Sequence, residues 1–133
     1  MDMLAFAKGV ADRIEAEATR TKTPLAVCVM DIHGNLVLHH RMNGAPAFSM
    51  GLAERKAYTS ALVGQRTADI VQLTQPGQAL YPLISQERFC AMGGGAPLTR
   101  DGQLIAGVGV SGGSVEQDIA ILEAGLRETL AAA

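Results

Sequence analysis

Two hairpin-like stretches constrain the fold of this chain more than any other feature. Residues 25–42, LAVCVMDIHGNLVLHHRM, are two apolar runs joined by a short His-Gly-Asn turn. Residues 98–111, LTRDGQLIAGVGVS, repeat the arrangement around Asp101 and Gly102. Turns of this kind between strand-like runs are typical of tight β-hairpins. Because strands joined by tight hairpins run antiparallel, the sequence predicts a mainly antiparallel sheet.

Segments with helical periodicity lie before, between and after the two hairpins. Met3, Phe6 and Val10 recur at three- and four-residue steps, the spacing of one helix face. Gly64 is suited to ending the second helix, because glycine readily adopts the left-handed conformation of helix C-termini. Helices in these positions can cover the sheet, so the predicted class is α/β of the α+β type. The predicted helices span about Asp2–Thr19, Ala47–Gly64, Thr67–Leu73 and Val115–Leu130.

Two further short strands are predicted between the second and the last helix. They are ALYPLIS, residues 79–85, and RFCAM, residues 88–92. Pro82 weakens the first of them, because proline has no N–H to donate to a neighbouring strand.

The composition is that of a globular protein and argues against several classes of function. Hydrophobic residues make up 48% of the 133 residues, enough for a core in a single domain spanning 1–133. A net charge of −2 without any Lys/Arg cluster argues against a nucleic-acid partner. The apolar runs are too short to span a membrane, and the acidic N-terminus lacks a signal-peptide layout, so we expect a cytoplasmic protein. The low charged fraction, 18%, favours a homo-oligomer. Cys28 and Cys90 lie in separate apolar runs without a C-x-x-C, which predicts two reduced thiols.

The stretch GVGVSGG, residues 107–113, matches two catalytic motifs, and its context argues against both. A dinucleotide fingerprint needs a second parallel strand after its helix, but here the helix runs to the end of the sequence. A nucleophile elbow at Ser111 needs a later histidine, and none follows His40. Ser114 and Gln117 instead form a capping-box pattern, which predicts that the last helix satisfies its own first N–H groups.

Three sequence blocks together resemble the GlcG/HbpS-like family, which also occurs as the C-terminal domain of PduO-type cobalamin adenosyltransferases. They are VCVMDIHGNLVLHHRMNGAP (residues 27–46), AERKAYTSAL (residues 53–62) and GGGAPLTRDGQLIAGVGVSGGSVEQDIAILEAG (residues 93–125). The resemblance implies an α/β/α sandwich with an antiparallel sheet of about five strands. It also implies a homo-oligomer, from dimer up to octamer, and haem as a possible ligand, because some members bind haem.

Lys56 is the most informative candidate side chain, because it lies on the apolar stripe of its helix. Such a lysine either reaches solvent at an edge, pairs at a subunit contact, or lines a pocket. Its match to the family's K-A block favours a ligand pocket. Arg41 ends a predicted strand and could hold a carboxylate such as a haem propionate, or instead face solvent or pair with Asp31.

Glu116 and Asp118 match the family's E-Q-D block and are candidates for ligand binding or proton transfer, or partners of Lys56 or Arg41. Their position in the first turn of a helix is equally explained by the helix dipole. Gly94 and Gly95 precede Pro97 and could present backbone amides to an anionic ligand, or form a tight corner between strands.

The histidines are the candidates for a haem iron ligand. His39 and His40 alternate along one strand, so only one of them can face a given pocket. His33 lies in the hairpin turn and is expected to be exposed. Because the spacing does not support a site built from several histidines, one of them, His39 or His40, would ligate the iron alone.

Two functional hypotheses follow from these residues, beside a third in which the chain is a purely structural assembly subunit with no ligand. In the first, the chain is a ligand-binding accessory protein that holds haem or a related tetrapyrrole beside Arg41 and Lys56. In the second, it is a small catabolic enzyme, an isomerase, tautomerase or lyase acting on an organic acid. There Arg41 would hold the carboxylate and Lys56, Glu116 or Asp118 would move a proton.

Overall fold

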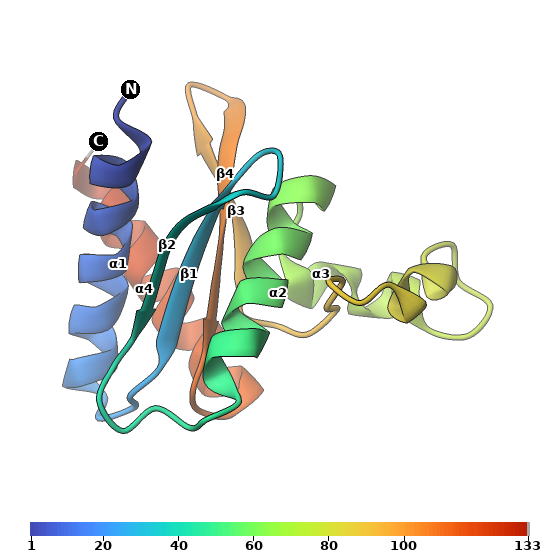
Figure 1. The fold of residues 1–133 in the computed structure, drawn as a ribbon, viewed down its shortest axis with the longest axis horizontal. Helices are drawn as coiled ribbons and strands as arrows, with labels where there is room; N and C mark the ends of the chain where they lie inside the picture. Colours follow the sequence, from blue (N-terminus) through green and yellow to red (C-terminus); the bar gives the residue numbers. More distant parts are fainter. Residues whose placement is uncertain (133) are drawn as a thin grey trace.

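A computed structural model of the chain, which describes residues 1–132, has an antiparallel sheet between two helical layers (Figure 1). The sheet order is β2-β1-β4-β3, so each predicted hairpin forms a neighbouring pair. Helices α1 and α4 cover one face of the sheet, and α2 covers the other (Figure 1). The α/β/α sandwich is thereby confirmed. The strands are β1 (Ala26–Asp31), β2 (Leu36–Arg41), β3 (Gly95–Arg100) and β4 (Gln103–Ser111), and the helices are α1 (Met3–Arg20), α2 (Ser49–Val63), α3 (Thr67–Ile70) and α4 (Val115–Ala132).

Local chemistry explains where these elements begin and end. Asp101 and Gly102 both have positive φ, 52° and 77°, as the tight turn between β3 and β4 requires. Gly64 ends α2 in the left-handed conformation, as expected. The capping box is also confirmed, because Gln117 N–H donates to Ser114 Oγ at 3.1 Å and Ser114 N–H donates to Gln117 Oε1 at 2.8 Å.

The apolar core has two unequal parts, one on each face of the sheet. The larger part fills the space between the sheet and the α1/α4 layer, where Val27, Val29 and Val108 meet Ile14 and Leu122. The smaller part lies under α2 and consists mainly of small side chains. Its members are Ala26, Cys28, Met30, Ala53 and Ala57.

Glycines of β4 let α2 lie directly on the sheet. A Cβ on Gly107 would come within 2.5 Å of the Ala57 carbonyl oxygen, and one on Gly109 would overlap the Ala53 carbonyl oxygen. Both glycines therefore serve close packing of helix on strand. Gly107 and Gly109 of GVGVSGG thus have a structural explanation in this fold that needs neither catalytic motif.

The structure corrects the expectation of strands in residues 79–92. Tyr81–Ser85 forms a 3-10 helix, η2, in which Pro82 occupies a starting position that needs no N–H donor. Residues 88–92 form no strand either, because Cys90 N–H donates to Thr59 Oγ1 at 2.8 Å instead of to a strand. The sheet of the described residues accordingly has four strands rather than about five.

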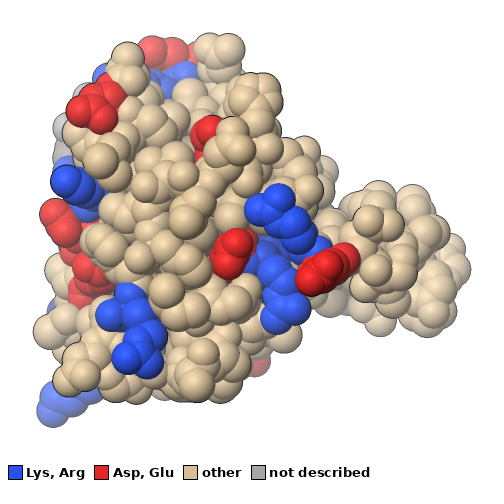
Figure 2. All heavy atoms as spheres, in the orientation of Figure 1, with Lys and Arg blue, Asp and Glu red and all other residues tan. Residues whose placement is uncertain are grey.

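Residues 70–86 project from the body of the molecule and are called the arm below (Figure 1). The predicted helix over Thr67–Leu73 is realised as α3 followed by a second short 3-10 helix, η1 (Val71–Thr74). Leu80 N–H donates to the Leu73 carbonyl at 2.8 Å, so the arm folds back on itself. Figure 2 shows it as a lobe without charged side chains, in agreement with the sequence between Asp69 and Glu87.

No helix among the described residues has the length and apolarity needed to cross a bilayer.

Candidate functional site

Lys56 and Asp118 form an ion pair enclosed by the protein. Lys56 is 0% exposed, and its Nζ lies 3.5 Å from Oδ2 of Asp118. The amine also donates a hydrogen bond of 2.9 Å to the carbonyl oxygen of Val110, at the end of β4. The pair therefore joins α2 to α4 across the end of the central strand. The sequence hypothesis that Asp118 is a partner of Lys56 holds.

Asp118 also closes the turn between β4 and α4. Its Oδ1 accepts a hydrogen bond from Gly113 N–H at 2.9 Å. Burial raises the pKa of Asp118, and the bond from Gly113 and the charge of Lys56 oppose this only in part. Burial likewise lowers the pKa of Lys56, with the charge of Asp118 opposing it. Desolvation thus outweighs the mutual attraction of the two groups.

The glycine corner packs onto Lys56 and leaves it no opening to solvent in the protomer. Gly94 has φ +120°, and a Cβ there would come within 2.8 Å of Lys56 Nζ. Gly95 is buried as well, and its N–H donates to Thr67 Oγ1 at 2.8 Å. Gly94 and Gly95 therefore form a tight corner, one alternative that the sequence left open, but the corner leads from the loop after η2 into β3 and does not join two strands. Lys56 is enclosed because neighbouring backbone fills the space around its amine.

Arg41, His39 and His40 lie on β2, an edge strand, away from the Lys56 pair. Arg41 and His39 pair across the sheet with Ala26 and Cys28, which belong to the core under α2, so both face the α2 side. His39 Nε2 lies 3.0 Å from the Met50 carbonyl oxygen of α2. The Arg41 side chain is exposed, and within the described part of the chain it has no ion-pair or hydrogen-bond partner.

His40 faces the opposite side, as the alternation along the strand predicts. Its Nδ1 lies 2.8 Å from Glu15 Oε2 of α1, and the ring is partly exposed. A carboxylate on one ring nitrogen is the arrangement that orients metal-ligating histidines through the other nitrogen. His33 is exposed in the hairpin turn, as expected. Asp31 does not pair with Arg41; its Oδ1 accepts from His33 N–H and Asn35 N–H, both at 2.9 Å.

Glu116 and Asp118 lie on different sides of α4. Glu116 is exposed in the first turn, whereas Asp118 points inward to Lys56. The structure therefore brings together only Lys56, Asp118 and the glycine corner from the predicted set. Arg41, Glu116 and the two histidines lie outside that cluster. Among the described residues no three His, Cys, Asp or Glu side chains come close enough together to hold a metal ion.

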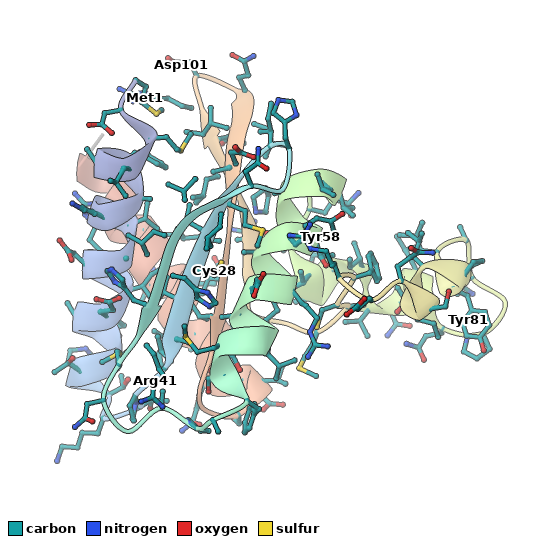
Figure 3. All side chains as sticks on the ribbon, in the orientation of Figure 1. Met1, Cys28, Arg41, Tyr58, Tyr81 and Asp101 are labelled. Atoms are coloured by element: carbon teal, nitrogen blue, oxygen red, sulfur yellow. The ribbon has the colours of Figure 1, made fainter. Side chains whose placement is uncertain are left out.

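A hollow with a mainly apolar lining lies between α2 and the return of the arm. It has a volume of about 350 Å³, within the range of small-molecule sites. Figure 3 shows Tyr58 on the side of α2 toward the arm, well separated from Arg41 at the far end of β2. We call this hollow the groove; its lining is Tyr58, Thr59, Leu62, Val63, Leu83, Gln86, Glu87, Arg88 and Phe89.

Arg88 fixes one side of the groove. Its guanidinium carbon lies 3.8 Å from the centroid of the Tyr58 ring, and its Nη2 donates to the Gly34 carbonyl at 3.2 Å. A second, smaller hollow of about 220 Å³ shares Glu87 and Arg88 and adds Arg55 of α2. Arginines and the acid Glu87 thus lie at the edge of a groove whose other walls are mainly apolar.

Sequence reasoning missed this groove. Tyr58 and Leu62 are four residues apart on α2, which places them on one helix face, and this spacing was the available signal. The opposite wall comes from residues 83–89, whose position depends on how the arm folds back.

Both cysteines agree with expectation, because Cys28 and Cys90 are free thiols and burial raises the pKa of each.

Comparison with known proteins places this geometry in a family. The family model described as haem degrading protein HbpS-like matches residues 3–127. An uncharacterized 15.0 kDa protein from the dhaT–dhaS intergenic region of Citrobacter freundii is 41% identical over 125 residues. That match covers 92% of this chain and 88% of the relative.

Two solved structures share the fold closely. The ORFY protein of Klebsiella pneumoniae superposes with a TM-score of 0.88 at 37% identity, covering 96% of this chain and 90% of that one. The haem complex of PduOC also gives a TM-score of 0.88, at 36% identity, with 92% of this chain and 91% of that chain covered. The second of these similar proteins was therefore solved with haem bound.

Proposed function

The chain belongs to the HbpS-like family, and we propose that it is an accessory protein that binds haem or a related tetrapyrrole in the groove between α2 and residues 83–89. A similar protein, PduOC, forms a haem complex. The observation that carries the proposal is the pairing of apolar groove walls with arginine at the edge.

The groove residues fit the chemistry of a porphyrin. Leu62, Val63 and Leu83 offer aliphatic side chains to a flat apolar ring, and Phe89 offers an aromatic one. Haem also carries two propionates, which Arg88 at the groove and Arg55 beside it would hold by charge-assisted hydrogen bonds. The groove opens to solvent, so it would cover the ring in part and leave an edge accessible.

Tyr58 is the residue in the groove that would ligate the iron. A phenol oxygen serves as the axial haem ligand in some proteins. His40 is the alternative, because Glu15 holds its Nδ1 and leaves Nε2 for a metal. Bound haem would supply redox and oxygen chemistry, while the chain would hold the ring and shield part of it from water.

Titration with haemin, followed by the Soret band, tests the proposal. We expect a shifted band that saturates at one haem per chain. Leu62→Glu introduces a charge against the apolar ring and the propionates and should weaken binding at least about tenfold. Leu4→Glu on α1 is the matched control, because Leu4 is 45% exposed and Leu62 is 47% exposed.

Apart from the histidine variants, three outcomes would count against the proposal. They are an unshifted Soret band, equal binding by Leu62→Glu and the wild type, or equal weakening by Leu4→Glu. His39→Ala and His40→Ala should leave the affinity unchanged. If His40→Ala abolishes the shifted band while Leu62→Glu does not, the haem site lies on β2 and the groove assignment is wrong.

A further inference from the structure

The smaller hollow beside the groove is lined almost entirely by charged side chains. It has a volume of about 220 Å³, and we call it the charged hollow; its lining is Gly51, Glu54, Arg55, Glu87 and Arg88. Figure 2 shows acidic and basic side chains gathered beside the base of the arm. One acid and one arginine belong to α2, and the other acid and arginine directly follow the arm. The lining therefore offers both signs of charge from both walls.

The charges of the hollow do not neutralise each other by direct pairing. In the part of the chain that the structure describes, neither Glu54 nor Glu87 forms an ion pair with Arg55 or Arg88. Opposite charges that line one hollow without pairing can each bind a group of opposite sign on a ligand.

Arg88 is held in place but keeps donors free. Its guanidinium carbon lies 3.8 Å from the centroid of the Tyr58 ring, and its Nη2 donates to the Gly34 carbonyl oxygen at 3.2 Å. A guanidinium has N–H groups on three nitrogens, and those on Nε and Nη1 take no part in the hydrogen bonds of the described residues. An arginine fixed in this way loses little freedom when a carboxylate binds, which favours binding.

Gly51 keeps the α2 wall of the hollow open. Glycine inside a helix costs stability relative to alanine, so its presence there needs a reason. A Cβ on Gly51 would meet nothing within 4 Å, and close packing therefore does not account for it. Its place in the lining offers a reason, because a side chain there would take up space that a ligand needs.

We propose that the charged hollow binds a small zwitterion of the α-amino-acid type. The two arginines would hold its carboxylate, and the two glutamates its ammonium group, by charge-assisted hydrogen bonds. The acids would repel a simple anion, and the arginines would repel a simple cation. The volume also fits a small ligand, since it lies below the range of about 300–1,000 Å³ that is typical of pockets for drug-sized molecules.

This proposal does not rest on haem binding. Glu54 lines the charged hollow and not the groove. Because Arg55 and Arg88 are also the arginines proposed to hold the propionates, haem and the zwitterion would compete, so the experiment uses haem-free protein. A failure of that experiment leaves the haem proposal standing, and an unshifted Soret band leaves this one standing.

Nuclear magnetic resonance titration of the haem-free protein with alanine, propionate and ethylamine tests the proposal. The three molecules are similar in size, but propionate lacks the ammonium group of alanine and ethylamine lacks its carboxylate. Alanine should shift the amide signals of residues 51–55 and 87–88 and saturate with a dissociation constant of about 1 mM, because exposed ion pairs contribute little each. Propionate and ethylamine should bind about tenfold more weakly.

Gly51→Leu should abolish the shifts caused by alanine, because it fills the hollow and leaves all four charged side chains in place. Gly9→Leu on α1 is the matched control. A Cβ on Gly9 meets only the far end of the Arg13 side chain, at 3.1 Å, so this variant should bind alanine like the wild type.

Glu54→Gln distinguishes recognition of two charges from binding of a simple anion. It should weaken binding of alanine and strengthen binding of propionate, because one repelling carboxylate is gone. Glu116→Gln is the control, since it removes an exposed acid of α4 outside the hollow and should change neither affinity. The proposal is overturned by alanine shifts that do not saturate, by equal binding of alanine and propionate, by unchanged alanine binding in Gly51→Leu or Glu54→Gln, or by equal losses in the controls.

Discussion

The amine of Lys56 on α2 lies 3.5 Å from the carboxylate of Asp118 on α4, and neither side chain reaches solvent. Removing water from two charges costs free energy, which their attraction offsets in part, and only when both partners are present. The pair therefore acts as an internal clamp that holds α2, the end of β4 and the start of α4 together.

Lys56→Met should lower the free energy of unfolding by about 3–5 kcal/mol, because it leaves the Asp118 carboxylate buried without a counter-charge. Asp118→Asn should cost less than Asp118→Ala, since an amide oxygen can still accept from Gly113 N–H. Urea unfolding followed by far-ultraviolet circular dichroism measures all three. A loss below about 1 kcal/mol for Lys56→Met would show that the pair contributes little.

The deficit of Lys56→Met should shrink in acid. Burial already raises the pKa of Asp118 above its unfolded value, and removing the lysine raises it further. When the pKa of a carboxyl group is higher in the folded than in the unfolded protein, the fold is most stable below the unfolded-state pKa, about 3.9. That stability is lost as the pH rises through the folded-state pKa. The difference between wild type and variant should therefore be smaller near pH 4 than at pH 7. A difference independent of pH would contradict this account.

Gly109→Ala should destabilise the fold by several kcal/mol or prevent folding, because the new methyl group would overlap the Ala53 carbonyl oxygen of α2. Gly51→Ala is the control, since a Cβ there meets nothing within 4 Å. That change lies within α2 and should stabilise by about 0.5–1 kcal/mol. Thermal unfolding of the two variants distinguishes the explanations. Close packing at Gly109 predicts a lower midpoint temperature for Gly109→Ala only, whereas a general intolerance of alanine would lower the midpoint of both variants.

Asp31→Asn should weaken the fold at neutral pH and lose its effect in acid. Partial burial opposes ionisation of Asp31, but N–H groups of Asn35 and His33 outweigh it and lower the pKa of the carboxyl. A carboxyl group whose pKa is lower in the folded protein stabilises the fold at pH values above the unfolded-state pKa of about 3.9. That stabilisation is lost as the pH falls through the folded-state pKa. We expect a cost of about 0.5 kcal/mol at pH 7, given solvent screening. Equal effects at pH 7 and pH 2 would refute this.

Arg88→Lys should loosen the segment that closes the groove. Lysine keeps the charge but loses the flat guanidinium that stacks on Tyr58 and the bond to the Gly34 carbonyl. In hydrogen exchange, the free energy of opening measured for amides near Cys90 should fall by about 1–2 kcal/mol. The opening free energy of amides in α1 should not change. Unchanged protection near Cys90 would show that the stacking does not hold the segment.

Much of the fold was predictable from short-range chemistry. The turns at Gly34 and at Asp101–Gly102, the end of α2 at Gly64 and the capping box of Ser114 all depend on neighbouring residues only. Lys56 stood out because a charge on an apolar helix stripe demands a partner. Its partner Asp118 was one of two acids, with Glu116, in the first turn of the last predicted helix. Only the packing of α4 shows that Asp118 faces Lys56 and Glu116 faces solvent.

The arm and the groove were not predictable in the same way. Apolar residues around Pro82 fit a strand as well as a 3-10 helix, and the choice depends on whether a strand edge lies beside them. The groove needs Tyr58 of α2 to meet residues 83–89, a contact that depends on the path of the whole arm. The side chains that sequence favoured as ligands, Lys56 and Asp118, satisfy each other inside the protomer instead.

The most direct test of the central proposal locates the haem on the protein. Ferric haem broadens nuclear magnetic resonance signals of nearby residues, and gallium protoporphyrin provides a diamagnetic control. With one equivalent of haemin, amide signals from Tyr58 to Val63 and from Leu83 to Phe89 should broaden, while those of α1 remain sharp. Broadening centred on His39 and His40 of β2, with the groove signals unaffected, would contradict the account.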